Sequence, residues 1–592
     1  MTHTNPTEYY RERLEHYKLQ SKALYKRMTV LSTLRVLVFL AAAFGICFYF
    51  SFWQLALIIA VVCIALFVYL LANHTHVKHQ KKFYDALIKI NQDELTIASG
   101  EFYDRDKGLE FQDPKHYYSL DIDLFGRGSF FQYVNRTETK EGKEQLANAI
   151  KANEVNNVKL RQEVIKELAS KPKWRQFYAA NASLVAVETP AKTIISWLGN
   201  YKSFLPRLIK WMPLVFSVST IILFIGIATE VITNQNILGF WFFAGLALTG
   251  KYVKQTNQLS SNVDKVKDTF RQYTVLLDLI ENEIFQSELL QQKQKQIKSE
   301  TEKASVIFKK LSRSLDALDN RNNIIGAIFG NGLFLTDIKN TYRIEQWIET
   351  YKTKVVDWFE VVSFFDAYST LGNFVYNHPE YVFPVIHNSK HIIKSEGLGH
   401  PLLNAGKRVD SDVIIEKEQF FIVTGANMAG KSTFLRTISL HIVMANVGLP
   451  VCAKSSFYTP IKLITSMRTS DSLTDDSSYF FSELTRLKYI VDTINEDPYF
   501  IVLDEILKGT NSTDKAIGSR KFVEKLVSSN ATGIIATHDL SLCEAEKELE
   551  AIKNYYFDAK IINDELHFDY KLKQGVCKNM NASFLLKKME IV

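Results

Sequence analysis

The chain has 592 residues, of which 47% are hydrophobic and 23% charged, and its formal net charge is +7. This length allows several domains, and the overall composition is ordinary for soluble proteins, so any membrane signal must be local. The modest positive charge excludes neither an anionic lipid surface nor a nucleic acid as a partner. The cysteines form no Cys-x-x-Cys pair, which argues against a zinc site and against a disulfide framework.

The first strong signal is an uncharged apolar stretch at 36–73, which follows a basic and polar N-terminal segment. One straight helix of that length would be about 55 Å long, nearly twice the roughly 30 Å of a hydrocarbon core. We therefore expect a transmembrane hairpin, with its turn near 51–54 and aromatic side chains at the interface. The stretch starts too late and is too long for a secretory signal. A buried helical hairpin in a soluble core is the alternative.

A second pair of apolar segments is less regular. Residues 211–229 carry no charge, a polar break follows at 230–236, and the apolar run 237–250 is short for a membrane span. We expect a second transmembrane hairpin at 211–250, with a buried element of a helical bundle as the alternative.

Basic residues flank both proposed hairpins, whereas neither proposed turn contains Lys or Arg. The positive-inside rule then places both termini and the C-terminal region in the cytoplasm of a multi-pass protein of the inner or plasma membrane. Further along, apolar residues at three- and four-residue spacing over 263–284 predict a long helix with one buried seam.

Residues 425–433 read Gly-Ala-Asn-Met-Ala-Gly-Lys-Ser-Thr, a complete phosphate-binding loop. The run 419–424 is typical of a buried parallel strand and 433–447 of a helix, which is the context that the motif requires. Glycine lets backbone N–H groups point at phosphate oxygens, and a helix N-terminus favours anions. Lys431 would reach the β- and γ-phosphates, and the Ser432 hydroxyl would bind Mg²⁺. The predicted nucleotide-binding residues are Gly425, Ala426, Asn427, Met428, Ala429, Gly430, Lys431, Ser432 and Thr433.

Two more apolar strands end in polar side chains. The run from 499 leads to Asp504 and Glu505, and the run from 533 leads to His538. Ligands of parallel sheets bind at the carboxyl ends of the strands. Asp504 is thus expected to hold Mg²⁺, and Glu505 to orient or deprotonate the attacking water. His538 is expected to contact the γ-phosphate and completes a predicted catalytic set with Glu505 and Lys431. The alternatives are a solvated acidic turn and a structural histidine.

With these motifs the chain resembles the MutS family of ATPases, relatives of the ABC-type ATPases, from about residue 120 to the C-terminus. The phosphate loop and the run Asp-Glu-Ile-Leu-Lys-Gly-Thr-Asn-Ser-Thr at 504–513 carry the resemblance, although the family usually has Gly-Arg-Gly-Thr-Ser in the latter. Residues 124–142 and 358–371 are similar to the opening and closing segments of the family's helical core.

The resemblance implies an ABC-type α/β fold, ATP with Mg²⁺, and a homodimer that encloses the nucleotide. In the family a serine approaches the γ-phosphate of the partner subunit, and here Ser478 or Ser477 takes that position, with Ser-Ser in place of the usual Ser-Thr. The predicted organisation is an N-terminal helix at 1–35, a transmembrane hairpin at 36–73, a linker at 74–120, an all-α core and lever at 121–390 that contains the hairpin at 211–250, and an α/β P-loop ATPase domain at 391–592.

The resemblance does not extend to mismatch recognition. About 35 residues precede the first apolar stretch, and the Phe-x-Glu sequence Phe481-Ser-Glu483 falls within the ATPase region. We therefore expect a membrane-anchored ATPase whose helical arms transmit nucleotide-driven changes. A DNA-binding repair or recombination protein tethered to the membrane is one alternative. An ABC-type transporter component is another, although the chain has no Leu-Ser-Gly-Gly-Gln signature.

Overall fold

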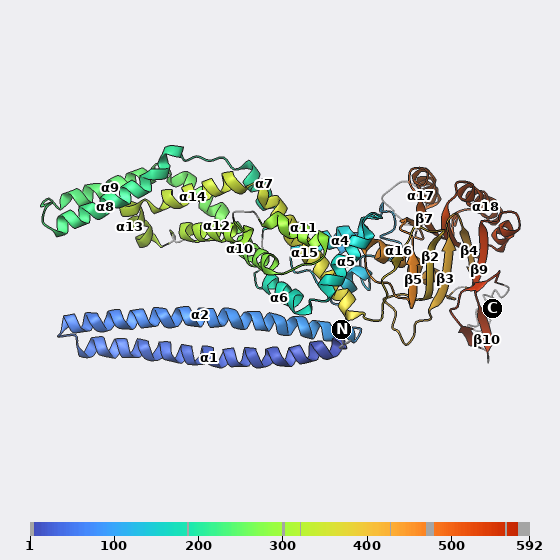
Figure 1. The fold of residues 1–592 in the computed structure, drawn as a ribbon, viewed down its shortest axis with the longest axis horizontal. Helices are drawn as coiled ribbons and strands as arrows, with labels where there is room; N and C mark the ends of the chain where they lie inside the picture. Colours follow the sequence, from blue (N-terminus) through green and yellow to red (C-terminus); the bar gives the residue numbers. More distant parts are fainter. Residues whose placement is uncertain are drawn as a thin grey trace.

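Two prongs extend to the same side of a helical centre, and a sheet-containing C-terminal unit lies at the opposite end of the molecule (Figure 1). This computed structural model describes residues 5–185, 189–298, 302–319, 321, 323–426, 428–468, 479–562 and 565–577. Helices account for most of the described chain, and the strands are confined to its last third.

The first prong is a hairpin of two long antiparallel helices, α1 (Pro6–Phe48) and α2 (Trp53–Ala98). Its turn lies at 49–52, close to the predicted position. Near that turn the apolar side chains face outward: Phe44 is 74% exposed and Ile64 63%. Residues 74–98, expected in a linker, instead continue α2, because Leu87 and its neighbours pack against Tyr17 of α1 and Phe177 of α6 (Pro172–Ser183).

The second prong contains two short apolar helices, α8 (Met212–Ala228) and α9 (Asn236–Gly250), which the predicted polar break separates. A third apolar helix, α13 (Ile324–Phe334), packs against α9 so closely that a Cβ at Gly245 would lie 2.5 Å from the Gly332 carbonyl oxygen. Helix α13 was not predicted from the sequence. It is flanked by α12 (Ala304–Asp319) and α14 (Thr336–Tyr351), which lead back to the centre.

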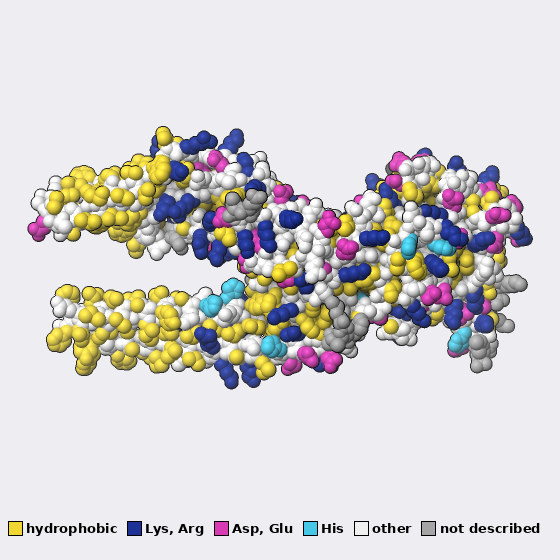
Figure 2. Space-filling model, in the orientation of Figure 1, with side chains coloured by type: hydrophobic (Ala, Val, Ile, Leu, Met, Phe, Trp, Pro, Cys, Tyr) yellow, Lys and Arg dark blue, Asp and Glu magenta, His cyan; other side chains and the backbone are white. Residues whose placement is uncertain are grey.

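By length and composition, three of the described helices could cross a membrane: Pro6–Phe48, Trp53–Ala98 and Arg207–Ala228. The apolar helices α9 and α13 are shorter. Figure 2 shows that hydrophobic side chains cover the outer parts of both prongs, while Lys and Arg gather where the prongs approach the centre. The two apolar zones therefore lie on the same side of the molecule, with basic residues behind each.

The centre is a helical bundle built around α15 (Lys354–Asn377), which is buried along most of its length. The long helix α10 (Val253–Asn282) has the predicted seam, with Val263, Phe270 and Leu277 fully buried. The remaining helices of the centre are α3 (Phe130–Val134), α4 (Lys140–Lys151), α5 (Val158–Ala169), α6 (Pro172–Ser183), α7 (Ala191–Asn200) and α11 (Glu288–Ile297). Short 3₁₀ turns lie at Leu109–Phe111, Arg207–Trp211 and Leu540–Lys547.

The C-terminal unit contains a six-stranded sheet in the order β12-β9-β4-β8-β7-β6. Five strands are parallel, and the edge strand β12 is antiparallel to β9. Strands β4, β7 and β8 are almost wholly buried, as expected for a parallel sheet covered on both faces. These strands are β4 (Phe420–Gly425), β6 (Lys462–Ser466), β7 (Tyr499–Asp504), β8 (Thr532–Ala536), β9 (Ile552–Phe557) and β12 (Lys573–Gln574).

A four-stranded sheet in the order β1-β5-β2-β3 and a β10–β11 hairpin complete the strands. The helices of the unit are α16 (Lys431–Val447), α17 (Tyr479–Thr493) and α18 (Ser512–Ser528). One continuous hydrophobic core runs from the helical centre into the sheet. The additional strands are β1 (Val385–Ile386), β2 (His391–Leu398), β3 (Ser411–Glu416), β5 (Ser455–Tyr458), β10 (Ala559–Ile562) and β11 (Glu565–Phe568).

Candidate functional site

The predicted phosphate loop connects the carboxyl end of β4 to the N-terminus of α16. Gly430 caps the helix with φ of 104°, a conformation that favours glycine, and a Cβ there would lie 3.2 Å from the ring of Tyr570. A Cβ at Gly425 would lie 2.7 Å from the Phe557 carbonyl oxygen of the neighbouring strand β9. The two glycines are therefore required by backbone shape and by close packing.

Lys431 is the first residue of α16, and only 6% of it is exposed. Its Nζ donates hydrogen bonds to the carbonyl oxygens of Gly425 and Ala426, at 2.8 and 3.1 Å. Burial lowers the pKa of the Lys431 ammonium, and the carboxylates of Glu505 and Asp504 oppose that change. The carbonyl oxygens of the loop thus hold the buried Lys431 ammonium group, and the negative charges of Glu505 and Asp504 act on the same group.

Ser432 and Asp504 lie side by side, because β7 ends beside the N-terminus of α16. The Ser432 hydroxyl donates to Oδ2 of Asp504 at 2.7 Å. Mg²⁺ prefers oxygen ligands and usually takes one or two from the protein, the rest from water and substrate phosphates. The exposed Ser432 hydroxyl and the Asp504 carboxylate lie together at the N-terminus of α16 and can supply two such oxygen ligands. The described residues contain no cluster of three or more His, Cys, Asp or Glu side chains suited to a metal.

Glu505 and His538 meet at the ends of β7 and β8. The Nε2 atom of His538 lies 3.0 Å from Oε1 of Glu505 and 3.2 Å from Nζ of Lys431. A proton on Nε2 can be donated to Glu505, whereas an unprotonated Nε2 can accept from Lys431. The hydrogen bond from His538 lowers the pKa of the Glu505 carboxyl to about 2. Whether Nε2 of His538 carries a proton therefore decides whether His538 pairs with Glu505 or with Lys431.

The structure brings most of the predicted site residues together at one edge of the sheet. Met428 is 77% exposed with φ of 67°, Ala429 is fully buried beneath the loop, and Thr433 is exposed in the first turn of α16. Asn427, Ser477 and Ser478, by contrast, lie outside the described residues.

One residue that the sequence analysis did not assign to the site is Glu483 of α17. Its carboxylate accepts hydrogen bonds from the backbone N–H groups of Leu507 at 2.6 Å and Lys508 at 3.1 Å. Glu483 is 4% exposed, and burial raises its pKa. These contacts fix the backbone directly after Glu505, which itself has φ of 51°. The sequence signal was weak, because Glu483 bonds to backbone groups and has no motif partner.

The region that contains these residues is also similar to known proteins. A family model described as MutS domain V matches residues 421–588. "MutS protein homolog 4" of Homo sapiens is 33% identical over 204 residues, which cover 32% of this chain and 21% of that protein. "DNA mismatch repair protein MutS" of Fusobacterium nucleatum is 36% identical over 190 residues, covering 30% of this chain and 21% of that protein. The protein of the same name from Staphylococcus haemolyticus is 27% identical over 240 residues, which cover 39% of this chain and 27% of that protein.

The chain spans only about a quarter of the length of these curated relatives, and the family model covers the C-terminal region alone. A MutS domain V is therefore present at the C-terminus of a mostly helical chain.

Proposed function

We propose that this chain, which carries a MutS domain V, is a membrane-anchored ATPase that binds ATP at the carboxyl ends of β4, β7 and β8. The observation that carries the proposal is the convergence of Lys431, Ser432, Asp504, Glu505 and His538 at one sheet edge. Their chemistry matches phosphoryl transfer to water, in which the protein mainly positions groups and stabilises charge.

In this proposal the N-terminus of α16 and the loop N–H groups bind the phosphates, and Lys431 exchanges its bonds to loop carbonyls for phosphate oxygens. Ser432 and Asp504 hold Mg²⁺, which supplies positive charge opposite the phosphates when it is bound. Glu505, ionised because its pKa is about 2, accepts a hydrogen bond from the attacking water. His538 holds the Glu505 carboxylate and can donate toward the γ-phosphate.

The active unit proposed is a homodimer that encloses two nucleotides. Ser478, assigned by resemblance, would complete the site of the partner subunit. The site described here supports this arrangement because Ser432 and Thr433 are exposed, leaving the outer side of the loop accessible to a second copy.

The membrane part of the proposal rests on the two apolar zones. The exposed apolar helices of both prongs point away from the sheet, with Lys and Arg behind them. Exposed apolar surface of this extent suits a hydrocarbon environment, and the basic residues suit a cytoplasmic lipid surface. The proposed location is the inner or plasma membrane, with the MutS domain V in the cytoplasm.

The proposal is tested by ATP turnover of the purified full chain in detergent and in lipid nanodiscs, with and without duplex, mismatched or branched DNA. Lys431→Ala should abolish nucleotide binding, and Glu505→Gln should bind ATP while turnover falls at least a hundredfold. Normal turnover in Glu505→Gln would contradict its role. Strong stimulation by DNA, with affinity that falls steeply as salt rises, would favour the DNA-binding alternative.

A further inference from the structure

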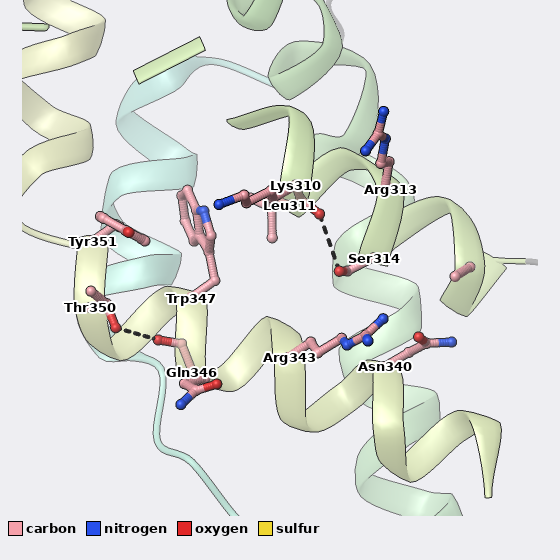
Figure 3. A pocket seen from close by; sticks show the side chains of 11 residues that line it. Lys310, Leu311, Arg313, Ser314, Asn340, Arg343, Gln346, Trp347, Thr350 and Tyr351 are labelled. Carbon is pink, nitrogen blue, oxygen red and sulfur yellow. Dashed lines mark hydrogen bonds between the residues drawn. The ribbon is translucent and has the colours of Figure 1, made fainter. Parts of the chain in front are cut away.

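The second prong has a cavity of about 480 Å³ between α12 and α14. Figure 3 shows how the side chains line it: Lys310, Arg313 and Ser314 come from α12, and Asn340, Arg343 and Trp347 come from α14. None of its lining residues is acidic. Trp347 is held in place because its indole N–H donates to the Ile307 carbonyl oxygen at 3.1 Å. The cavity thus has a basic rim beside a fixed aromatic wall.

Two of the cations in this cavity have no acidic partner. Neither Arg313 nor Arg343 forms an ion pair with any residue that the structure describes. Other cations on or near α12 and α14 are paired: Arg271 of α10 with Asp316, Arg321 with Asp337, and Lys310 with Glu302. Guanidinium groups bind phosphate oxygens through two parallel hydrogen bonds, and the Asn340 amide offers a further donor. The chemistry of the cavity is that of a phosphate site.

The cavity lies directly behind an apolar surface, because α13 connects α12 to α14. Ile324 and Ile325 of α13 are 72% and 71% exposed, and Phe329 is 57% exposed. At 1.5 Å per residue, Asn340 and Arg343 lie only about 6 and 10 Å along α14 from its first residue. If the apolar helices lie in hydrocarbon, this is the depth of the phosphate headgroups.

We infer that the cavity between α12 and α14 binds the phosphate of an anionic phospholipid headgroup at the cytoplasmic surface of the membrane. The inference rests on the proposed membrane anchoring and adds a specific lipid class to it. Arg313 and Arg343 bind the phosphate oxygens, while Trp347 and Tyr351, which lie farther along α14 from α13, pack against the polar headgroup beyond the phosphate. The apolar face of α13 accommodates the start of the acyl chains. The second prong is in this way held at a defined depth.

The test is a binding titration of the full chain in a neutral detergent, read by native mass spectrometry with phosphatidylglycerol or phosphatidylcholine. The wild type should bind phosphatidylglycerol at least tenfold more tightly. Arg313→Gln/Arg343→Gln should lose about tenfold in affinity. The matched control is Lys309→Gln/Lys339→Gln, which removes the same charge from exposed positions of the same two helices outside the cavity, and it should stay within twofold of wild type.

Equal losses in both double variants would overturn the inference, because they would indicate diffuse attraction instead of a site. Equal affinity for the two lipids would overturn it as well. If glycerol phosphate binds as tightly as phosphatidylglycerol, the ligand is a free phosphate ester and the lipid assignment is wrong. Binding of duplex DNA that depends on the two arginines, without lipid preference, would assign the cavity to nucleic acid instead.

Two further measurements distinguish loss of the lipid site from misfolding of a variant and from absence of membrane anchoring. Arg313→Lys/Arg343→Lys retains the charge and should keep part of the affinity, and each variant's melting temperature without lipid reports its folding. Carbonate extraction of membranes tests the anchoring itself: a chain released into the soluble fraction would contradict the proposed function. A chain that stays in the membrane while the titration shows no preference would contradict only the lipid site.

Discussion

Glu94 of α2 and Arg136, which follows α3, form a buried ion pair, with 2.6 Å between Glu94 Oε1 and Arg136 Nε. The amides of Asn373 and Asn377 on α15 also donate to the Glu94 carboxylate, at 2.9 and 2.8 Å. Burial opposes ionisation of Glu94, but Arg136 and these donors outweigh it, so the Glu94 pKa lies below its ordinary value. The first prong is thereby joined to the central helix α15, which leads into the sheet.

Removing one partner of this pair should loosen the first prong. Glu94→Gln should destabilise the folded chain by about 3–5 kcal/mol, because it leaves the Arg136 cation buried without its counter-charge. Hydrogen exchange should then increase at the base of α2. The control is Lys18→Gln, which breaks an exposed pair with Glu15 and should cost less than about 1 kcal/mol. Equal effects of the two substitutions would contradict the structural role of Glu94.

Gly142→Ala should destabilise the helical centre. A Cβ at Gly142 would lie 2.1 Å from Oδ2 of Asp366, which accepts hydrogen bonds from the Thr139 backbone N–H at 2.8 Å and hydroxyl at 2.6 Å. Forced displacement of this kind costs about 1–3 kcal/mol. Gly199→Ala is the matched control, because nothing lies within 4 Å of its added Cβ and alanine favours a helix. Thermal melting of the two variants in detergent compares them directly.

Asp366 should make stability depend on pH. Burial, the largest cause, raises the pKa of its carboxyl to about 6, from an ordinary value of 3.8. Folding therefore takes up a proton between about pH 4 and 6, and stability falls as pH rises through that window, by about 3 kcal/mol. Asp366→Asn should reduce this slope in denaturant titrations at pH 4, 5, 6 and 7, while Glu138, whose carboxyl pKa burial raises to about 8, keeps a slope of its own in both proteins. An unchanged slope in the variant would exclude Asp366 as its source.

Glu483 should act as a positioning residue for Glu505. Glu483→Ala leaves two backbone N–H groups unpaired near Glu505, the proposed catalytic carboxylate, at a cost of about 1–3 kcal/mol. We expect kcat to fall about tenfold or more while the affinity for ATP changes little. Glu524→Ala, which breaks an exposed pair with Arg520 on α18, is the control and should leave both values unchanged. A loss of ATP affinity that matches the loss of kcat would contradict positioning.

The sequence predicted best those features that depend on local pattern. The loop around Lys431, the strands before Asp504 and His538 and the seam of α10 all lie where their residue spacing predicts them. The turn of the first prong follows from length alone, since the uncharged stretch is nearly twice as long as one membrane crossing. Each of these features is predicted by residues that lie close together in the sequence.

Features that depend on tertiary packing were missed. Helix α13 is short and rich in glycine, a composition that weakens a helix in isolation, and one of its glycines, Gly332, packs against Gly245 of α9. The continuation of α2 beyond residue 73 depends on packing of Leu87 against α6. Glu483 bonds to backbone atoms about two dozen residues away, and a motif search does not register such a contact.

The central claim is that ATP joins two membrane-anchored copies of this chain through their C-terminal domains. The most direct measurement is the mass of purified Glu505→Gln chain in lipid nanodiscs or detergent, with and without Mg²⁺-ATP. We predict a dimer that forms with ATP and is lost when Lys431→Ala is added. A chain that needs neither detergent nor lipid, and whose mass is unaffected by ATP, would contradict the account.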